Sequence, residues 1–210
     1  MPWLDVPFPA MGGEDKRFDP ARLPQIPPFV GTISDEPCVS LVGMAGAGKS
    51  TLGRMVAAML GFAHMDTDRL IEATWGMPLQ ALLDDKGLTE FLRIEEDVVS
   101  RLWLKRCVIS TGGSVVYGPR AVKRLRCCGP VVFLRIDLAT FLARVGAAED
   151  RGFARPGGKS LAEVFAERQP LYAAMSDHQT ATDGMSPEDC ARDIVNWARP
   201  RLGSKQKDIA

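Results

Sequence analysis

Residues 43–51 read Gly-Met-Ala-Gly-Ala-Gly-Lys-Ser-Thr and match the pattern G-x-x-x-x-G-K-[ST]. They follow an apolar run at 38–42 and precede an amphipathic segment at 49–60, so the order is strand, loop, helix. Glycines let the backbone curl around a phosphate with its N–H groups pointing inward, and a helix that starts there adds unpaired donors and a positive dipole end. The stretch therefore predicts a phosphate-binding loop.

The side chains of this loop indicate which phosphate compound it binds. A lysine at the start of the helix can reach the β- and γ-phosphates of a nucleotide, so we expect Lys49 to be catalytic. The hydroxyl of Ser50 is placed to ligate Mg²⁺. We expect ATP with Mg²⁺ as the cofactors, and the predicted nucleotide-binding residues are Gly43, Gly46, Gly48, Lys49, Ser50 and Thr51.

Outward from the loop, short apolar runs alternate with helical segments, which is typical of a parallel sheet covered by helices on both faces. We predict an α/β protein with the three-layer P-loop kinase fold, a central parallel five-stranded sheet and a lid loop. The expected strands are 38–42, 63–65, 107–110, 131–135 and a weaker one at 179–182. The expected helices are 49–60, 68–85 with interruptions at Gly76 and Pro78, 88–104, 119–126, 138–145, 161–175 and one from Pro187 onward.

The chain divides into three parts. Residues 1–37 hold eight prolines without apolar periodicity, so we expect a flexible N-terminal extension. Residues 38–203 form the predicted kinase domain, and 204–210 form a tail. Between Val145 and Ser160 lies a stretch rich in glycine and arginine, which we interpret as the lid loop that closes over the phosphates.

Composition excludes several other classes of protein. The formal net charge is +0, so the chain lacks the basic surplus of nucleic-acid-binding proteins, and a small-molecule partner is expected. Its five cysteines show neither metal-ligand spacing nor a disulfide framework, and we treat the Cys127–Cys128 pair as apolar packing rather than as a redox switch. We find no membrane span or signal peptide, so we expect a soluble, cytoplasmic protein, with a monomer favoured.

A second cluster of polar residues follows the predicted second strand. Asp66-Thr67-Asp68 places two carboxylates at the end of that strand, where ligands of parallel sheets bind. One carboxylate can hold Mg²⁺ and the other can orient or deprotonate an acceptor hydroxyl, so we assign the metal to Ser50 and Asp66 and the catalytic role to Asp68. The glycines at 112 and 113 would let a ligand lie against backbone amides. The predicted substrate-binding residues are Asp68, Gly112, Gly113, Ser114 and Arg168.

In this order of motifs the chain resembles the shikimate kinase family over about residues 38–197. The phosphate loop, Asp66 to Asp68, and the segment Glu167-Arg168-Gln169-Pro170-Leu171-Tyr172 match the family's pattern well. The resemblance implies transfer of the γ-phosphoryl of ATP to an alcohol, with Arg168 holding the carboxylate of the acceptor. It also implies a catalytic lid arginine, for which Arg151 is the better match and Arg155 the fallback.

Three departures from the family pattern concern the substrates. Phe91 and Glu95 align with the family's F-R-x-x-E motif, so its carboxylate-binding arginine falls on Leu92. Adjacent helix positions point about 100° apart, so Arg93 cannot simply take its place. The third glycine of the family's turn is Ser114 here, and the adenine-side arginine expected near 182–187 is absent.

The missing arginine affects the choice of acceptor. Loss of a charge-assisted contact to a carboxylate costs roughly 1.5–3 kcal/mol, which would weaken the binding of shikimate. The ammonium group of a zwitterion would be repelled by a second arginine, so the first expectation is homoserine, an amino acid with a primary hydroxyl. Arg168 would hold its carboxylate, and Asp68 or Glu95 would lie near its ammonium or hydroxyl. The alternative is that the chain still phosphorylates shikimate with a rearranged site. A distant alternative is a regulatory module that binds nucleotides without catalysis.

Overall fold

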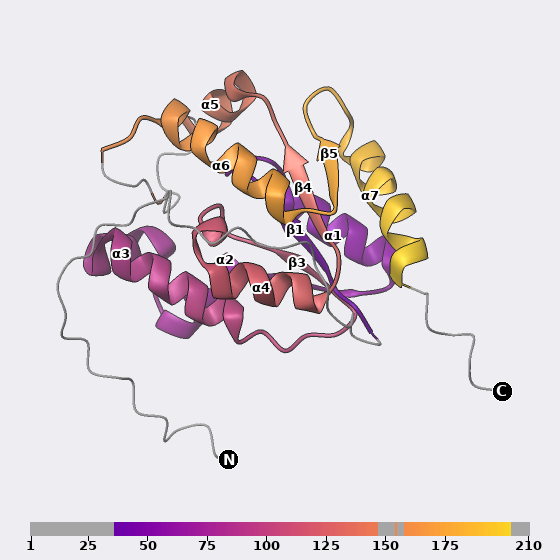
Figure 1. Ribbon diagram of the computed structural model, residues 1–210, viewed down its shortest axis with the longest axis horizontal. Helices are drawn as coiled ribbons and strands as arrows, with labels where there is room; N and C mark the ends of the chain where they lie inside the picture. The colour runs from indigo at the N-terminus through magenta and orange to yellow at the C-terminus, as the bar shows by residue number, and fades with distance from the viewer. Residues whose placement is uncertain (1–35, 147–153, 155–157, 203–210) are drawn as a thin grey trace, which may run out of the picture.

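The computed structural model describes residues 36–146, 154 and 158–202. Its centre is a five-stranded sheet with the order β2-β3-β1-β4-β5, in which all neighbouring strands are parallel (Figure 1). This confirms the predicted α/β class and the five-stranded parallel sheet. The strands are β1 (Val39–Val42), β2 (Ala63–Asp66), β3 (Cys107–Ser110), β4 (Val131–Arg135) and β5 (His178–Ala181).

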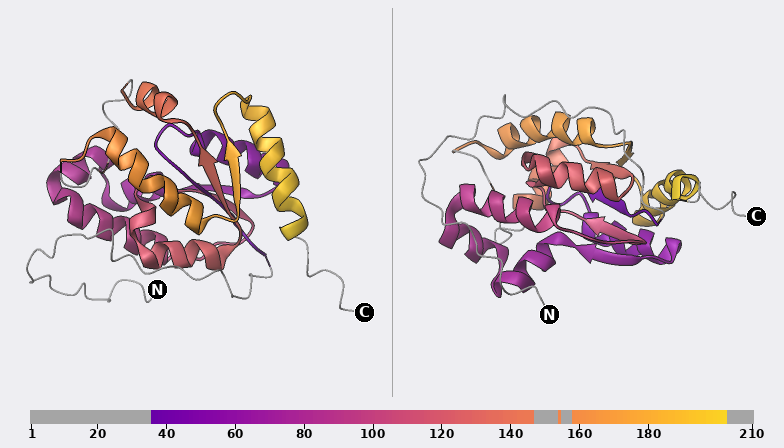
Figure 2. Two further views of the ribbon diagram at one scale, coloured as in Figure 1. Left: turned by 45° about the horizontal axis from the view of Figure 1, so that its top comes forward. Right: turned by 60° about the horizontal axis from the view of Figure 1, so that its bottom comes forward.

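Helices cover both faces of the sheet, which gives three layers (Figure 2). Helices α1 and α7 pack together on one face, while α4 and α6 contact the other face and α3 packs against α4. A short 3₁₀ helix, Val115–Tyr117, follows β3. The α-helices are α1 (Lys49–Leu60), α2 (Thr67–Trp75), α3 (Leu79–Ser100), α4 (Pro119–Cys128), α5 (Leu138–Gly146), α6 (Leu161–Met175) and α7 (Pro187–Leu202).

The region between β2 and β3 differs from the expected helix boundaries. The predicted break at Gly76 is correct, because Gly76 ends α2 with φ 68°. The next helix starts at Leu79 and continues to Ser100, although the backbone departs from helical geometry at Gly87, with φ 72° and ψ 165°. The expected end at residue 104 is wrong: Leu102 is buried, and its N–H bonds to Val99 in a tight turn that leads the chain toward β3.

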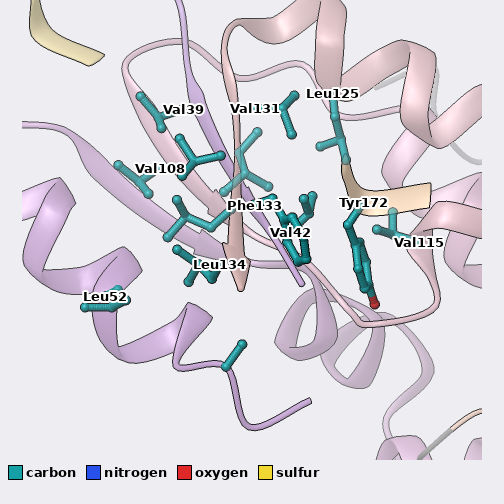
Figure 3. Close-up of a cluster of buried hydrophobic side chains, with 14 of the residues drawn as sticks. Val39, Val42, Leu52, Val108, Val115, Leu125, Val131, Phe133, Leu134 and Tyr172 are labelled. Carbon is teal, nitrogen blue, oxygen red and sulfur yellow. The ribbon is translucent and has the colours of Figure 1, made fainter. Parts of the chain in front are cut away.

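The core lies around the sheet and extends to the turn that follows β3. All four residues of β1 and of β3 are buried, as expected for strands covered on both faces. Figure 3 shows Tyr172 of α6 beside Phe133 of β4, with the tyrosine hydroxyl directed out of the apolar cluster. The two ring centroids are 5.2 Å apart, and the hydroxyl donates a hydrogen bond to the Gly113 carbonyl. Core packing therefore fixes the position of this turn.

In the Cys127–Cys128 pair, Cys128 is buried and Cys127 is half-buried. All five cysteines are free thiols, and four of them are buried: Cys38, Cys107, Cys128 and Cys190. In the described part of the chain, no helix is long and apolar enough to span a bilayer. The N-terminal extension up to residue 35, the last eight residues and the lid candidates Arg151 and Arg155 lie outside the described residues.

Candidate active site

The phosphate loop has a backbone that only glycine adopts readily. Gly43, Gly46 and Gly48 have φ values of 144°, 77° and 89°. A Cβ on Gly43 would lie 2.6 Å from the Leu134 carbonyl oxygen of β4, so this glycine is also required by close packing on the neighbouring strand. Helix α1 starts directly after Gly48, and the unpaired N–H groups of its first turn lie at the end of the loop. The geometry fits a phosphate group.

Lys49 is held inside the curl of the loop. Its side chain is buried, and Nζ donates hydrogen bonds to the carbonyl oxygens of Gly43 and Met44, both at 2.8 Å. Burial lowers the pKa of Lys49 to about 8, against the opposing effect of Asp68 and Asp66. The loop thus positions a cation where the phosphates of a nucleotide would bind.

Oxygen atoms from α1 and from the end of β2 meet beside the loop. Ser50 Oγ donates a hydrogen bond of 2.6 Å to Asp66 Oδ2, and Asp66 Oδ1 accepts the Asp68 N–H at 3.1 Å as the cap of α2. Mg²⁺ prefers oxygen ligands and takes one or two carboxylates together with phosphates and water. The donor set therefore suits the metal predicted for Ser50 and Asp66.

Two contacts of the loop were not anticipated from the sequence. Arg144 of α5 donates a hydrogen bond of 2.7 Å to the Gly46 carbonyl, and Thr182 donates one of 3.3 Å to the Ala47 carbonyl. No local pattern marks either residue, because each contact joins segments far apart in the chain. Thr51, predicted to bind the nucleotide, lies exposed in the first turn of α1.

The acceptor side is built around Gly112. A Cβ on Gly112 would overlap Glu95 Oε1 and lie 2.7 Å from Asp68 Oδ1, so both carboxyl groups converge on this residue. The Gly112 N–H donates a hydrogen bond of 3.1 Å to Thr67 Oγ1, which ties the end of β3 to the start of α2. Thr67 is fully buried, and this positioning role was missed because Thr67 was considered only as the spacer of the D-T-D motif.

The two carboxyl groups differ in their surroundings. Burial raises the pKa of Asp68 to about 6, while Lys49 opposes the shift. Burial, followed by the charge of Asp68, raises the pKa of Glu95 to about 7, and Ser114, Arg168 and Lys49 act in the opposite direction. The sequence assigned Asp68 a catalytic role, whereas Glu95 was considered only as an alternative to Asp68 near the ammonium or hydroxyl of the acceptor.

Arg168 reaches the same turn from α6. Its side chain is 1% exposed, Nε donates to the Tyr117 hydroxyl at 3.1 Å and Nη2 donates to the Ala154 carbonyl at 2.6 Å. Its guanidinium also lies 4.9 Å from the centre of the Tyr117 ring, and Nη1 would be 3.4 Å from a Cβ on Gly113. The structure thus brings Arg168 to the glycine turn. Tyr117 was missed, because a single aromatic residue after the turn carries no recognisable pattern.

The residues at the departure from the family motif occupy different sides of α3. Leu92 is partly buried and packs against both apolar clusters of the protein. Arg93 has a side chain that is 56% exposed and contacts Glu90 at 3.4 Å. The geometry agrees with the expectation that Arg93 does not take the place of the missing arginine.

Comparison with known proteins agrees with this geometry. The sequence model of the family described as shikimate kinase matches residues 45–199. The shikimate kinase of Persephonella marina is 31% identical over 162 residues, covering 77% of this chain and 98% of the relative. That of Moorella thermoacetica is 34% identical over 168 residues, with 79% and 96% covered. A structure of shikimate kinase from Acinetobacter baumannii in complex with shikimate matches with a TM-score of 0.71 and 28% identity, covering 82% of this chain and 96% of that one, which confirms the P-loop kinase fold. The chain therefore belongs to the shikimate kinase family.

Proposed function

We propose that this chain is a shikimate kinase that transfers the γ-phosphoryl group of ATP to a hydroxyl of shikimate. Membership of the family makes it a phosphotransferase with an alcohol group as acceptor. The observation that carries the finer proposal is the buried Arg168 beside Gly113, next to the carboxyl groups of Asp68 and Glu95. This arrangement offers a cation for the carboxylate of shikimate and an acidic group for its hydroxyls.

The comparisons favour shikimate over the homoserine expected from the sequence. The family that matches is described as shikimate kinase, and the relatives and the solved structure reported above carry that name. Homoserine was expected because Leu92 replaces one arginine of the family pattern. However, Tyr117 and the Ala154 carbonyl hold Arg168 in a fixed orientation, which would strengthen the remaining carboxylate contact.

The nucleotide side supplies binding and charge neutralisation. The backbone N–H groups of the loop and the start of α1 would hold the phosphates of ATP, with Lys49 beside them. Ser50 and Asp66 would hold Mg²⁺, which neutralises the charge of the phosphates when bound. The catalytic role expected for Arg151, with Arg155 as its alternative, remains a prediction.

The acceptor side orients the reacting hydroxyl. Asp68 is half-buried. Lys49 and Asp66 lie close enough to affect its pKa, which Lys49 lowers and Asp66 raises. As a carboxylate, Asp68 can accept a hydrogen bond from the acceptor hydroxyl and take up its proton during transfer. Arg168 would fix the other end of shikimate through its carboxylate, so the two groups together set the direction of attack.

An assay of ADP release with shikimate and homoserine, followed by identification of the phosphorylated product by mass spectrometry, tests the proposal. We expect kcat/KM for shikimate to exceed that for homoserine by at least about 100-fold, because homoserine brings an ammonium group toward Arg168 and lacks the additional hydroxyl groups of shikimate, each of which can form a hydrogen bond. The D68N variant should lose most of the shikimate activity and still bind ADP. A preference for homoserine, or nucleotide binding without turnover of either alcohol, would contradict the proposal.

A further inference from the structure

We propose that Glu95 holds a proton in the acceptor site and donates it as a hydrogen bond to the carboxylate of the acceptor. Glu95 would thus act beside Arg168 as a second, uncharged group that selects for an acidic alcohol. The inference rests on the proposed function, because it names a specificity-determining residue of that same site.

Geometry places Glu95 on the acceptor side of the glycine turn. Its side chain is 2% exposed, and Oε1 occupies the space beside Gly112 that a Cβ would take. Arg168 Nη1 lies beside the next residue of the turn, 3.4 Å from the Cβ position of Gly113. The carboxyl group of Glu95 and the guanidinium of Arg168 therefore flank one short piece of backbone, on which a small ligand can rest.

The groups that face Glu95 leave it without a direct cationic partner. Asp68 faces it from α2, Lys49 from α1, Arg168 from α6 and the Ser114 hydroxyl from the turn after β3. Within the described part of the chain, no lysine or arginine forms an ion pair with Glu95. One helical turn earlier on α3 the residue is the apolar Leu92, which packs into the core.

These surroundings favour the neutral acid. Taking a carboxylate out of water without a paired cation is costly, and a second carboxylate nearby adds repulsion. Burial and the charge of Asp68 raise the pKa of Glu95 to about 7, although Ser114, Arg168 and Lys49 oppose the shift. Glu95 is therefore protonated in a large fraction of the molecules near neutral pH.

A neutral carboxylic acid suits an anionic ligand. It carries one O–H donor, whereas an ionised carboxylate only accepts hydrogen bonds and would repel the acceptor's own carboxylate. Arg168 supplies the positive charge for that carboxylate, and Glu95 supplies the additional donor. With the charge from Arg168 and the donor from Glu95, the site can bind an acid even though Leu92 replaces the arginine of the family pattern.

The proposal predicts how affinity depends on pH. The hydrogen-bond donor is present below a pH of about 7 and is lost as the pH rises through that value. If only the protonated form binds shikimate, the Kd rises by up to about tenfold per pH unit above 7. Binding at pH 8 must also draw a proton from the buffer.

Calorimetric titration of shikimate into the full chain saturated with ADP and Mg²⁺, at pH 6, 7 and 8, tests this prediction. At pH 8 the titration is repeated in two buffers of different ionisation enthalpy, which measures proton uptake directly. We expect a rising Kd and an uptake approaching one proton per shikimate for the wild type. E95Q keeps a donor that does not titrate, so its Kd at pH 6 should lie within about threefold of the wild-type value, with little change up to pH 8 and no uptake.

Controls separate this inference from its alternatives. E90Q removes an acid on the exposed side of the same helix and should keep the wild-type pH profile. If the wild type shows no proton uptake, or if E95Q retains it, the role of Glu95 is refuted while the proposed function stands, and the wild-type measurement decides even if E95Q fails to fold. If the wild type neither binds nor phosphorylates shikimate at any pH, the proposed function itself is wrong.

Discussion

The phosphate loop and the acceptor site are assembled in opposite ways. The loop consists of nine consecutive residues, 43–51, and its shape depends on backbone torsions at three glycines. The acceptor site combines side chains from α2, α3 and α6 with the turn after β3. A contiguous backbone site tolerates little change, because its geometry is lost with any one glycine. A site built from separate elements can exchange one contact for another.

Replacement of Lys49 tests the loop side and should give the largest effect. K49M removes the cation that we propose binds the phosphates, so we expect kcat to fall by more than about 10³-fold. Burial lowers the pKa of Lys49 to about 8, so the folded state carries the full cost of burying this charge at pH 7 and that cost disappears only as the pH rises above 8. Thermal unfolding at pH 7 should therefore show a Tm equal to or above that of the wild type. A large loss of stability would mean that Lys49 is mainly structural.

An added methyl group at Gly112 tests whether the acceptor site can be disturbed without an effect on nucleotide binding at the phosphate loop. In G112A the new Cβ would collide with Glu95 Oε1 and Asp68 Oδ1, and we expect kcat/KM for shikimate to fall by about 10²-fold. The affinity for ADP, measured by calorimetry, should change by less than about threefold. If kcat/KM for shikimate and the affinity for ADP fell by similar factors, the turn after β3 would also shape the phosphate loop.

A substitution at Arg168 sharpens the comparison within the acceptor site. Lysine keeps the charge but loses the planar fork that reaches Tyr117 and the Ala154 carbonyl, so R168K should raise the KM for shikimate by about 10- to 30-fold. The milder variant Y117F removes the hydroxyl that accepts the Nε hydrogen bond and should have a smaller effect in the same direction. Unchanged KM values in initial-rate assays of both variants would place the carboxylate of shikimate elsewhere.

The stability of E95Q provides the smallest and most specific test. The pKa of Glu95 is raised from 4.5 to about 7, so the unfolded chain releases this proton at a lower pH and the stability of the wild type falls as pH rises between these values. E95Q lacks this cost, which is on the order of 2 kcal/mol and is fully present above pH 7. Thermal unfolding should show a Tm advantage of a few degrees for E95Q at pH 7.5 and little difference at pH 4.5. A constant difference would show that the pKa of Glu95 is not raised in the folded protein.

The same contrast explains what could be predicted from the sequence. The phosphate loop, the parallel sheet and most helices followed from local patterns, because glycine spacing and apolar periodicity act over a few residues. Asp68 and Arg168 stand in recognisable motifs, and the structure brings both side chains to the glycine turn after β3. The roles of Tyr117, Thr67 and Arg144 were not foreseen, because each depends on a contact formed only when distant segments pack together.

The acceptor was the least predictable feature for the same reason. Leu92 was interpreted as the loss of a substrate contact and led to homoserine. The burial of Glu95 and its position beside Gly112 could not be deduced from residue order, although our proposal for the acceptor site depends on them. A missing side chain in a dispersed site is therefore weak grounds for a change of substrate.

Helix α3 consists of two helical segments, because the backbone departs from helical geometry at Gly87. The first segment carries Leu82, and the second carries Phe91 and Glu95. Both segments contribute side chains to the apolar cluster that also contains Ala154. Because the backbone leaves helical geometry at Gly87, a displacement of the first segment need not be transmitted along the helix axis to the second. Glu95 can therefore keep its position beside Gly112 if the start of α3 shifts, while the apolar cluster that contains Ala154 joins the two segments.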